Sequence, residues 1–315
     1  MKGTPHRPLL GIMLMIIGIS LLSGLDVFVK TLTQDYTIAQ TIFLRSLLAL
    51  PVILMFVPFE GGLKALKTER PMLHVSRGVV MIATAVCFFY SFQQLPLADA
   101  YALIFSSPLI VTVLAIPLLG EKVGRHRVAA VVIGFIGVLI AMRPGFGTLE
   151  VATYVALLGA VLYSFVQIFI RQMSRTESSI AIAFYGTVMI CTLAAATMPW
   201  YWQQPTREAW MMFIATGLLG GVGQYCLTTA FRFASASILA PYQYLSLIWG
   251  VIFGYFLFRD VPGVHTIIGS LVIAGSGLYI IHREAQKKRQ MVTAAVAPPI
   301  SPPTAISPAA KDKKP

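Results

Sequence analysis

The stretch LLGIMLMIIGISLLSGLDVFV at residues 9–29 is almost wholly apolar and contains one charged side chain, Asp26. A helix of about 20 apolar residues spans the hydrocarbon core of a bilayer, so this stretch is long enough to cross a membrane. A cleaved signal peptide has a shorter apolar core that ends in small residues, and the stretch shows neither property. It is therefore predicted to be a transmembrane helix.

The composition extends this interpretation to the whole chain. Of the 315 residues, 57% are hydrophobic and 11% are charged, and the mean hydropathy is +0.78. Soluble domains hold about 25% charged residues, so a water-soluble fold is excluded. The sequence does not alternate as barrel strands do, which predicts an all-α membrane protein with ten transmembrane helices. The nine further apolar runs lie at residues 38–58, 74–95, 97–119, 128–142, 151–170, 179–199, 210–231, 237–258 and 264–281.

Lysine and arginine indicate which connections face the cytoplasm, because cytoplasmic loops collect these residues. With the N-terminus inside, 19 of the 24 basic residues fall in inside segments and 4 in outside segments. Both termini are therefore expected in the cytoplasm. The basic loops also account for the net charge of +12, so nucleic acid is not expected as a partner. Residues 1–8 are expected to form a short cytoplasmic N-terminus, and the polar residues 284–315 a disordered cytoplasmic tail.

An internal repeat divides the chain into two halves. A shift of 139 positions pairs LLGEKVG at residues 118–124 with LFRDVPG at residues 257–263, and Ser107 with Ser246. Each half, 9–143 and 150–283, then holds five spans, and an odd number of spans places the second half upside down in the membrane. Inverted repeats of this kind are typical of carriers that work by alternating access, with the site near the midplane between the repeats.

Several short sequence motifs carry a family resemblance. They are LDVFVK at residues 25–30, FLRS at 43–46, LPLADA at 95–100, LGE at 119–121 and APYQY at 240–244. With these texts the chain resembles the drug/metabolite transporter superfamily, in particular its ten-helix EamA-type carriers, over nearly all of residues 9–283.

This resemblance implies a secondary carrier for a small organic metabolite in the bacterial inner membrane, without a cofactor. The texts at residues 25–30 and 240–244 are most similar to S-adenosylmethionine uptake carriers, and riboflavin uptake carriers are close behind. Carriers of amino acids and amines share the fold. The lipid bilayer and a small-molecule cargo are the expected partners, and the chain is expected to be a monomer or a homodimer.

Asp26 and Arg45 are the ionisable residues that lie deepest in apolar sequence. A charge at the bilayer centre costs about 2.5–3.5 kcal/mol on insertion scales, so each is expected to face the protein interior. They could bind cargo or a proton, or they could form an ion pair that only joins two helices. Alternatively Asp26 pairs within its helix with Lys30, which would extend to the outer interface. Gln167 stands at the position of Asp26 in the second half, under a shift of 141.

A second set of polar and aromatic residues lies at a similar depth in the other predicted helices. Hydroxyl, amide and aromatic groups can hydrogen-bond or stack on a cargo, and they can equally stabilise helix packing. The candidates that line a cavity are Tyr90, Tyr101, Ser107, Tyr185, Gln224, Gln243, Tyr244 and Trp249.

Other classes of protein find less support in the sequence. The three cysteines lie in apolar runs and form no metal-binding pattern, and the chain has no phosphate-binding loop and no nucleophile motif. A passive channel, a helper membrane subunit and an intramembrane enzyme remain as alternatives to a carrier. Charged residues at predicted helix ends, His74 with Arg77, Glu121 with Arg125, and Asp260, are expected to anchor turns.

Overall fold

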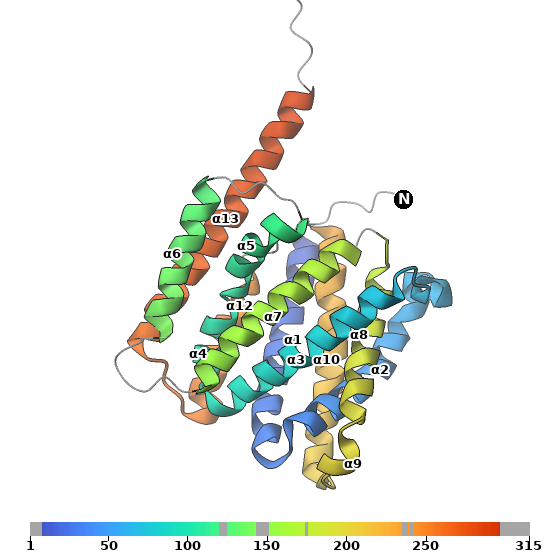
Figure 1. The fold of residues 1–315 in the computed structure, drawn as a ribbon. Coiled ribbons are helices and arrows are strands. Elements are labelled where there is room, and N and C mark those ends of the chain that lie inside the picture. Colours follow the sequence, from blue (N-terminus) through green and yellow to red (C-terminus); the bar gives the residue numbers. More distant parts are fainter. Residues whose placement is uncertain are drawn as a thin grey trace, which may run out of the picture.

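The computed structural model of the chain is all-helical over the residues that it describes, 8–119, 125–142, 151–173, 176–234, 239 and 242–296. The helices lie side by side in a bundle (Figure 1). Their bounds are α1 Pro8–Asp35, α2 Ile38–Phe56, α3 Pro71–Gln94, α4 Leu97–Ile104, α5 Ser107–Leu119, α6 Arg125–Met142, α7 Val151–Met173, α8 Ser179–Ala195, α9 Met198–Tyr201, α10 Arg207–Phe233, α12 Leu245–Phe253 and α13 Val264–Val296.

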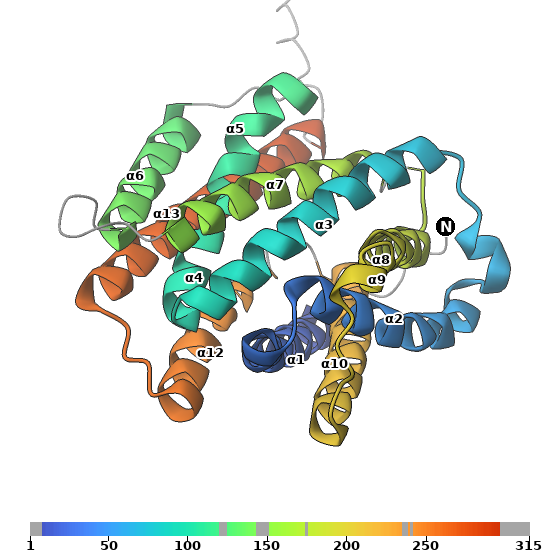
Figure 2. The ribbon, with the colours of Figure 1, turned by 60° about the horizontal axis from the view of Figure 1, so that its bottom comes forward.

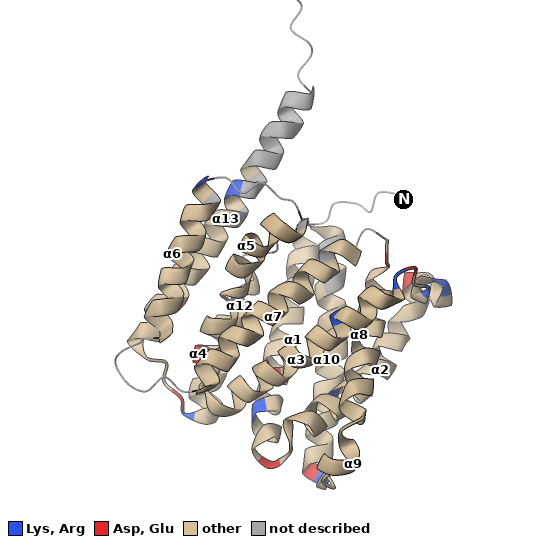
Figure 3. Cartoon of the chain, viewed as in Figure 1, with Lys and Arg blue, Asp and Glu red and all other residues tan. Residues whose placement is uncertain are grey.

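The lengths of these helices suit a membrane. Six helical segments of the described chain are long and apolar enough to cross a bilayer, and four further apolar helices are shorter. Leucine, isoleucine, valine and alanine dominate them, and a helix satisfies its own backbone hydrogen bonds in lipid. Figure 3 shows that the charged residues gather at helix ends and connections, while the middle of the bundle carries few. The chain is therefore a helical membrane protein.

Helices from before residue 143 pack against helices from after residue 150. Helix α1 lies along α10, α3 lies along α7, and α6 lies along α13. Helix α2 packs against both α8 and α10 (Figures 1 and 2). The two parts of the chain are thus interleaved and share one interior.

Two helices are interrupted close to each other. Helix α4 ends at Ile104 and α5 begins at Ser107, and the hydroxyl of Ser106 donates to the Leu103 carbonyl oxygen, 2.7 Å away, at this break. Helix α12 begins after a turn at Tyr244. The rings of Phe105 and Tyr244 have centroids 5.2 Å apart, so the two breaks are in contact.

Two connections are built from special helical turns. The segment after α2 forms two short 3-10 helices, η1 Val57–Glu60 and η2 Gly62–Leu66, joined by Gly61 with a φ of 111°. The π-helix η3, Gly254–Phe258, extends α12 and ends at Arg259, whose φ is 61°. The amide of Asp260 then donates to the Gly254 carbonyl oxygen at 2.9 Å, which turns the chain at this point.

The end of the chain corrects one expectation. Helix α13 continues to Val296, whereas the disordered tail was expected to begin at residue 284. Residues 284–289 are Glu-Ala-Gln-Lys-Lys-Arg, all strong helix formers, so the polar extension keeps the helical backbone. The N-terminal residues 1–7, the predicted turn around Glu121 and residues 297–315 lie outside the described part of the chain.

Close packing between α6 and α13 leads to a prediction about glycines. A Cβ atom on Gly269 would lie 2.7 Å from the Gly137 carbonyl oxygen and from Ala141, whereas one on Gly275 would meet nothing within 4 Å. We expect Gly269→Ala to lower the free energy of unfolding by about 1–3 kcal/mol, because backbone must move to make room. Gly275→Ala on the same helix serves as the control and is expected to be neutral or stabilising by up to about 1 kcal/mol. Melting temperatures in detergent measure both, and equal effects would contradict the packing.

Candidate functional site

Asp26 lies on α1 and is held by a side chain from α4. The Tyr101 hydroxyl donates to Oδ2 of Asp26 at 2.6 Å, and Tyr101 itself is buried. Ser23, one turn earlier on α1, is buried beside the same hydroxyl. Asp26 remains half-buried while its neighbour Leu25 is fully buried, so the carboxylate keeps some accessible surface inside the bundle.

Arg45 lies on α2 and faces the same interior. Its guanidinium carbon is 5.4 Å from the centroid of the Phe89 ring on α3, and the side chain is half-buried. Arg45 attracts Asp26 electrostatically, but no nitrogen of Arg45 lies within 4.0 Å of an Asp26 oxygen. The predicted ion pair that would only join the two helices is therefore not formed.

Lys30 does not pair with Asp26. It is 8% exposed, and its Nζ atom donates to the carbonyl oxygens of Phe92 and Leu95 at 3.1 and 2.6 Å. Asp260 Oδ2 lies 3.9 Å from the same nitrogen. The expected pairing with Asp26 is not formed, because the free carbonyls at the end of α3 bind the ammonium group instead.

Other predicted site residues converge beside Asp26. Trp249 on α12 donates from Nε1 to the Ser20 hydroxyl at 3.0 Å, and Ser20 lies on the same helix as Asp26. A Cβ atom on Gly250 of α12 would lie 2.5 Å from the ring of Tyr101, so this ring packs closely against α12. Helices α1, α4 and α12 thus bring Asp26, Tyr101 and Trp249 to one region, and Tyr244 joins it through the Phe105 ring.

The remaining predicted residues are more scattered. Tyr90 is half-buried against the main core cluster, and Ser107 is buried with its carbonyl oxygen accepting from the Ser164 hydroxyl at 3.1 Å. Gln167 and Gln243 are half-buried. Gln224 is exposed on α10.

Tyr185 belongs to a separate network at the end of the bundle where α1 begins, called here the N-terminal end. Its hydroxyl donates to the Leu66 carbonyl oxygen at 2.9 Å, and its ring lies 4.8 Å from the His74 ring. Arg77 is buried and donates from Nη1 to the Ile182 carbonyl oxygen at 2.7 Å. His74 and Arg77 were expected to anchor turns. His74 lies beside Glu177 in the connection before α8, and Arg77 reaches α8 itself.

Glu177 is the centre of this network, and the sequence analysis missed it. Its Oε1 accepts hydrogen bonds from the Thr68 hydroxyl at 2.9 Å and from the Glu69 amide at 3.0 Å, and His74 Nε2 lies 3.6 Å from Oε2. Glu177 is 8% exposed although it precedes the N-cap residue of α8 in a connection. The signal that could have found it is the scarcity of acidic residues, 12 in the whole chain.

Comparison with known proteins places this geometry in a family. The EamA-like transporter family matches residues 9–143 and again residues 151–282. The chain belongs to the EamA-like transporter family. This agrees with the resemblance seen in the short texts of the sequence.

Curated relatives of this family member are transporters of different cargoes. An S-adenosylmethionine uptake transporter of Rickettsia bellii is 28% identical over 83% of the chain and 90% of the relative. The pseudopaline exporter CntI of Pseudomonas aeruginosa is 29% identical over 84% of the chain and 93% of the relative. A riboflavin transporter of Rhizobium johnstonii is 26% identical over 91% of the chain and 95% of the relative. A protein of known crystal structure shares 17% sequence identity with this chain and matches its structure with a TM-score of 0.63. The match covers 88% of this chain and 98% of the other chain, which supports the fold.

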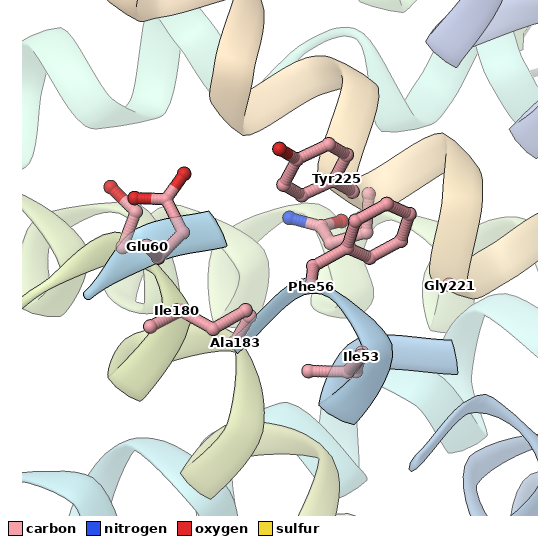
Figure 4. A pocket seen from close by; sticks show the side chains of 9 residues that line it. Ile53, Phe56, Glu60, Ile180, Ala183, Gly221 and Tyr225 are labelled. Carbon is pink, nitrogen blue, oxygen red and sulfur yellow. The ribbon is translucent and has the colours of Figure 1, made fainter. Parts of the chain in front are cut away.

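A pocket of this family member lies away from Asp26. It sits between α2, α8 and α10 and is lined by Ile53, Phe56, Glu60, Ser179, Ile180, Ala183, Gly221, Gln224 and Tyr225 (Figure 4). The rings of Phe56 and Tyr225 stack with centroids 3.7 Å apart. Of the predicted site residues, only Gln224 lines this pocket, so the pocket and the Asp26 region are different places in the bundle.

Metal binding has no evident site among the described residues. They contain no group of three or more His, Cys, Asp or Glu side chains that could hold an ion. Cys87, Cys191 and Cys226 are buried free thiols on different helices, in keeping with a packing role.

The Glu177 network leads to a prediction about pH. Burial raises the pKa of the Glu177 carboxyl, but hydrogen bonds from the Glu69 amide and the Thr68 hydroxyl, together with the nearby His74 ring, outweigh burial and hold the pKa below its ordinary value of 4.5. A lowered pKa stabilises the folded state above the ordinary value, and this stabilisation is lost as the pH falls through the folded-state pKa. We expect Glu177→Gln to cost about 1–2 kcal/mol near pH 7 and progressively less below about pH 4.5.

Melting temperatures measured over this pH range test the prediction. Glu208→Gln is the matched control, because Glu208 is exposed in the first turn of α10. A destabilisation by Glu177→Gln that stayed constant down to low pH would show that the carboxylate charge does not support the network.

Proposed function

We propose that this chain is a secondary active transporter that moves a small organic metabolite across the bacterial inner membrane by alternating access. Its membership of a transporter family and relatives named for transport in both directions support a carrier. The observation that carries the proposal is the position of Asp26 and Arg45, two half-buried opposite charges on α1 and α2, helices that both pack against α10 of the second half. Ionisable residues inside membrane helices are costly and mark transport pathways.

An inverted repeat of residues 9–143 and 150–283 accounts for the way the helices pack. If each helix of the first half corresponds to one of the second, in chain order, the α1–α10 contact corresponds to the α3–α7 contact. The α2–α10 contact corresponds to α3–α8 in the same way, and α2–α8, α4–α12 and α6–α13 each join a helix to its own counterpart. A two-fold relation between the halves produces this pattern of pairs.

The helix breaks fit the same relation. A shift of 139 positions carries Phe105, at the break between α4 and α5, onto Tyr244, at the turn before α12. The two rings are in contact, as expected for equivalent positions close to a two-fold axis. Interrupted helices at the repeat interface are the usual frame of a carrier's binding site, because they free backbone groups there.

Two layers of contact join the halves at opposite ends of the interior. Lys30 lies one helical turn beyond Asp26 and joins α1 to the ends of α3 and of the α12 segment, through Leu95 and Asp260. At the N-terminal end, Thr68 and Glu69 bind Glu177 in the connection between α7 and α8. Each layer links the two halves, and alternating access requires that the layers open in turn.

The cargo and its direction of movement differ among relatives. S-adenosylmethionine, riboflavin and an amino acid or amine are the candidate cargoes, and a passive channel is the alternative mechanism. Vesicles that contain the purified protein and are preloaded with unlabelled cargo should take up labelled cargo faster, because a carrier exchanges one molecule for another. Equal rates with and without preloading would indicate a channel.

Asp26→Asn is expected to separate transport from folding. Asn keeps the shape of the side chain and its contact with Tyr101, and no ion pair with Arg45 is broken, so the melting temperature should change little. Transport in vesicles should fall by about tenfold or more, since charge-assisted contacts to cargo are lost. Glu208→Asn, at an exposed position, is the control. Full transport by Asp26→Asn would contradict a role for this carboxylate.

The membrane orientation is tested by reporter fusions. We expect fusions after residues 204 and 290 to report opposite sides of the membrane, with residue 290 in the cytoplasm, because the basic residues are concentrated on that side. Fusions that report the same side would contradict the ten-span topology.

A further inference from the structure

We propose that Asp26 and Arg45 together bind the zwitterionic head of an α-amino acid, with the cargo ammonium at Asp26 and the cargo carboxylate at Arg45. This inference rests on the proposed function, since it names the class of cargo that the carrier takes. A cargo that lacks an α-amino acid head is excluded from this site, regardless of its other chemical groups.

The guanidinium of Arg45 has the properties of a binding group. Among the described residues it has no hydrogen-bond partner, and its contact is with the face of the Phe89 ring. The side chain is half-buried, so protein atoms do not enclose it completely. A guanidinium presents a rigid fork of N–H groups that fits a carboxylate with two parallel hydrogen bonds.

The carboxylate of Asp26 is oriented but not saturated. Tyr101 occupies Oδ2, and Oδ1 has no hydrogen-bond partner among the described residues. The hydroxyl of Tyr101 is fixed by burial, so it holds the carboxylate in one position. An ammonium group carries three donors and can bond to the remaining lone pairs of Asp26.

The balance of charge selects a zwitterion over a cargo with one charge. Asp26 and Arg45 attract each other without touching, so each charge is left without a direct partner of opposite sign. A simple amine would satisfy Asp26 and leave Arg45 unpaired, and a simple acid would do the reverse. A buried charge that lacks its partner is strongly unfavourable, whereas a zwitterion pairs both and adds no net charge.

Binding of matched probes to the purified protein tests this assignment. S-adenosylmethionine and L-methionine each carry the complete head, and decarboxylated S-adenosylmethionine and 3-(methylthio)propylamine lack only the carboxylate. Riboflavin carries no such head. Isothermal titration measures each dissociation constant, and uptake into vesicles is measured for the same compounds.

We expect a probe with the complete head to bind about tenfold to a hundredfold tighter than its mate without the carboxylate. Arg45→Gln should reduce this ratio to about one, and Arg207→Gln, which removes an exposed arginine at the start of α10, should preserve it. The double variant Asp26→Asn with Arg45→Gln leaves no unpaired charge. It should therefore fold and bind the paired probes equally.

Three results would overturn the assignment. Equal binding of paired probes by the unaltered protein, or an unchanged ratio in Arg45→Gln, would remove the role of Arg45. Riboflavin binding tighter than both amino acids would overturn the assignment and leave the proposed carrier function intact. Failure of every probe to enter the vesicles would count against both the assignment and the carrier function.

Discussion

The need to pair every charge inside an apolar bundle governs how this protein is arranged. The ammonium group of Lys30 is paired with the carbonyl oxygens of Phe92 and Leu95 and with Asp260. These contacts connect the end of α1 to α3 and to the connection after α12. At the other end of the bundle, the carboxylate of Glu177 is paired with Thr68, Glu69 and His74. Asp26 accepts a hydrogen bond from Tyr101 and Arg45 lies beside the Phe89 ring, but neither has a direct partner of opposite charge, and the proposed binding site uses both.

The class of fold could be predicted from the sequence because the composition and length of apolar runs identify membrane helices. Helix α3, Pro71–Gln94, differs from the predicted run 74–95 by a few residues. Asp26 and Arg45 were expected to face the interior because of their apolar surroundings, and both are half-buried. The partner of Lys30 could not be predicted, since the carbonyls that bind it become available only where α3 ends in space. Glu177 was missed for a similar reason: its position in a connection indicates exposure, and only the approach of residues 68–74 buries it.

The interleaving of the two halves has a mechanical consequence. Because α1 packs along α10 and α3 along α7, movement of either half must slide its helices against the other along long interfaces. Close contacts of backbone with backbone, as between Gly269 and Gly137, favour movement of rigid groups of helices over local bending. In the proposed mechanism the contacts at the two ends, which consist of a few polar side chains, are the parts that separate, while the packed helix faces stay together.

Locking the Lys30 layer shows whether the halves separate there during transport. Cysteines introduced at Lys30 and Asp260, in a chain whose three native cysteines are replaced, can be joined by a short bifunctional thiol reagent. We expect uptake into vesicles to stop after cross-linking with a reagent that reduction can cleave, and to return after cleavage. Each cysteine alone, treated in the same way, provides the reference rate. Transport at that rate through the cross-linked protein would contradict the account.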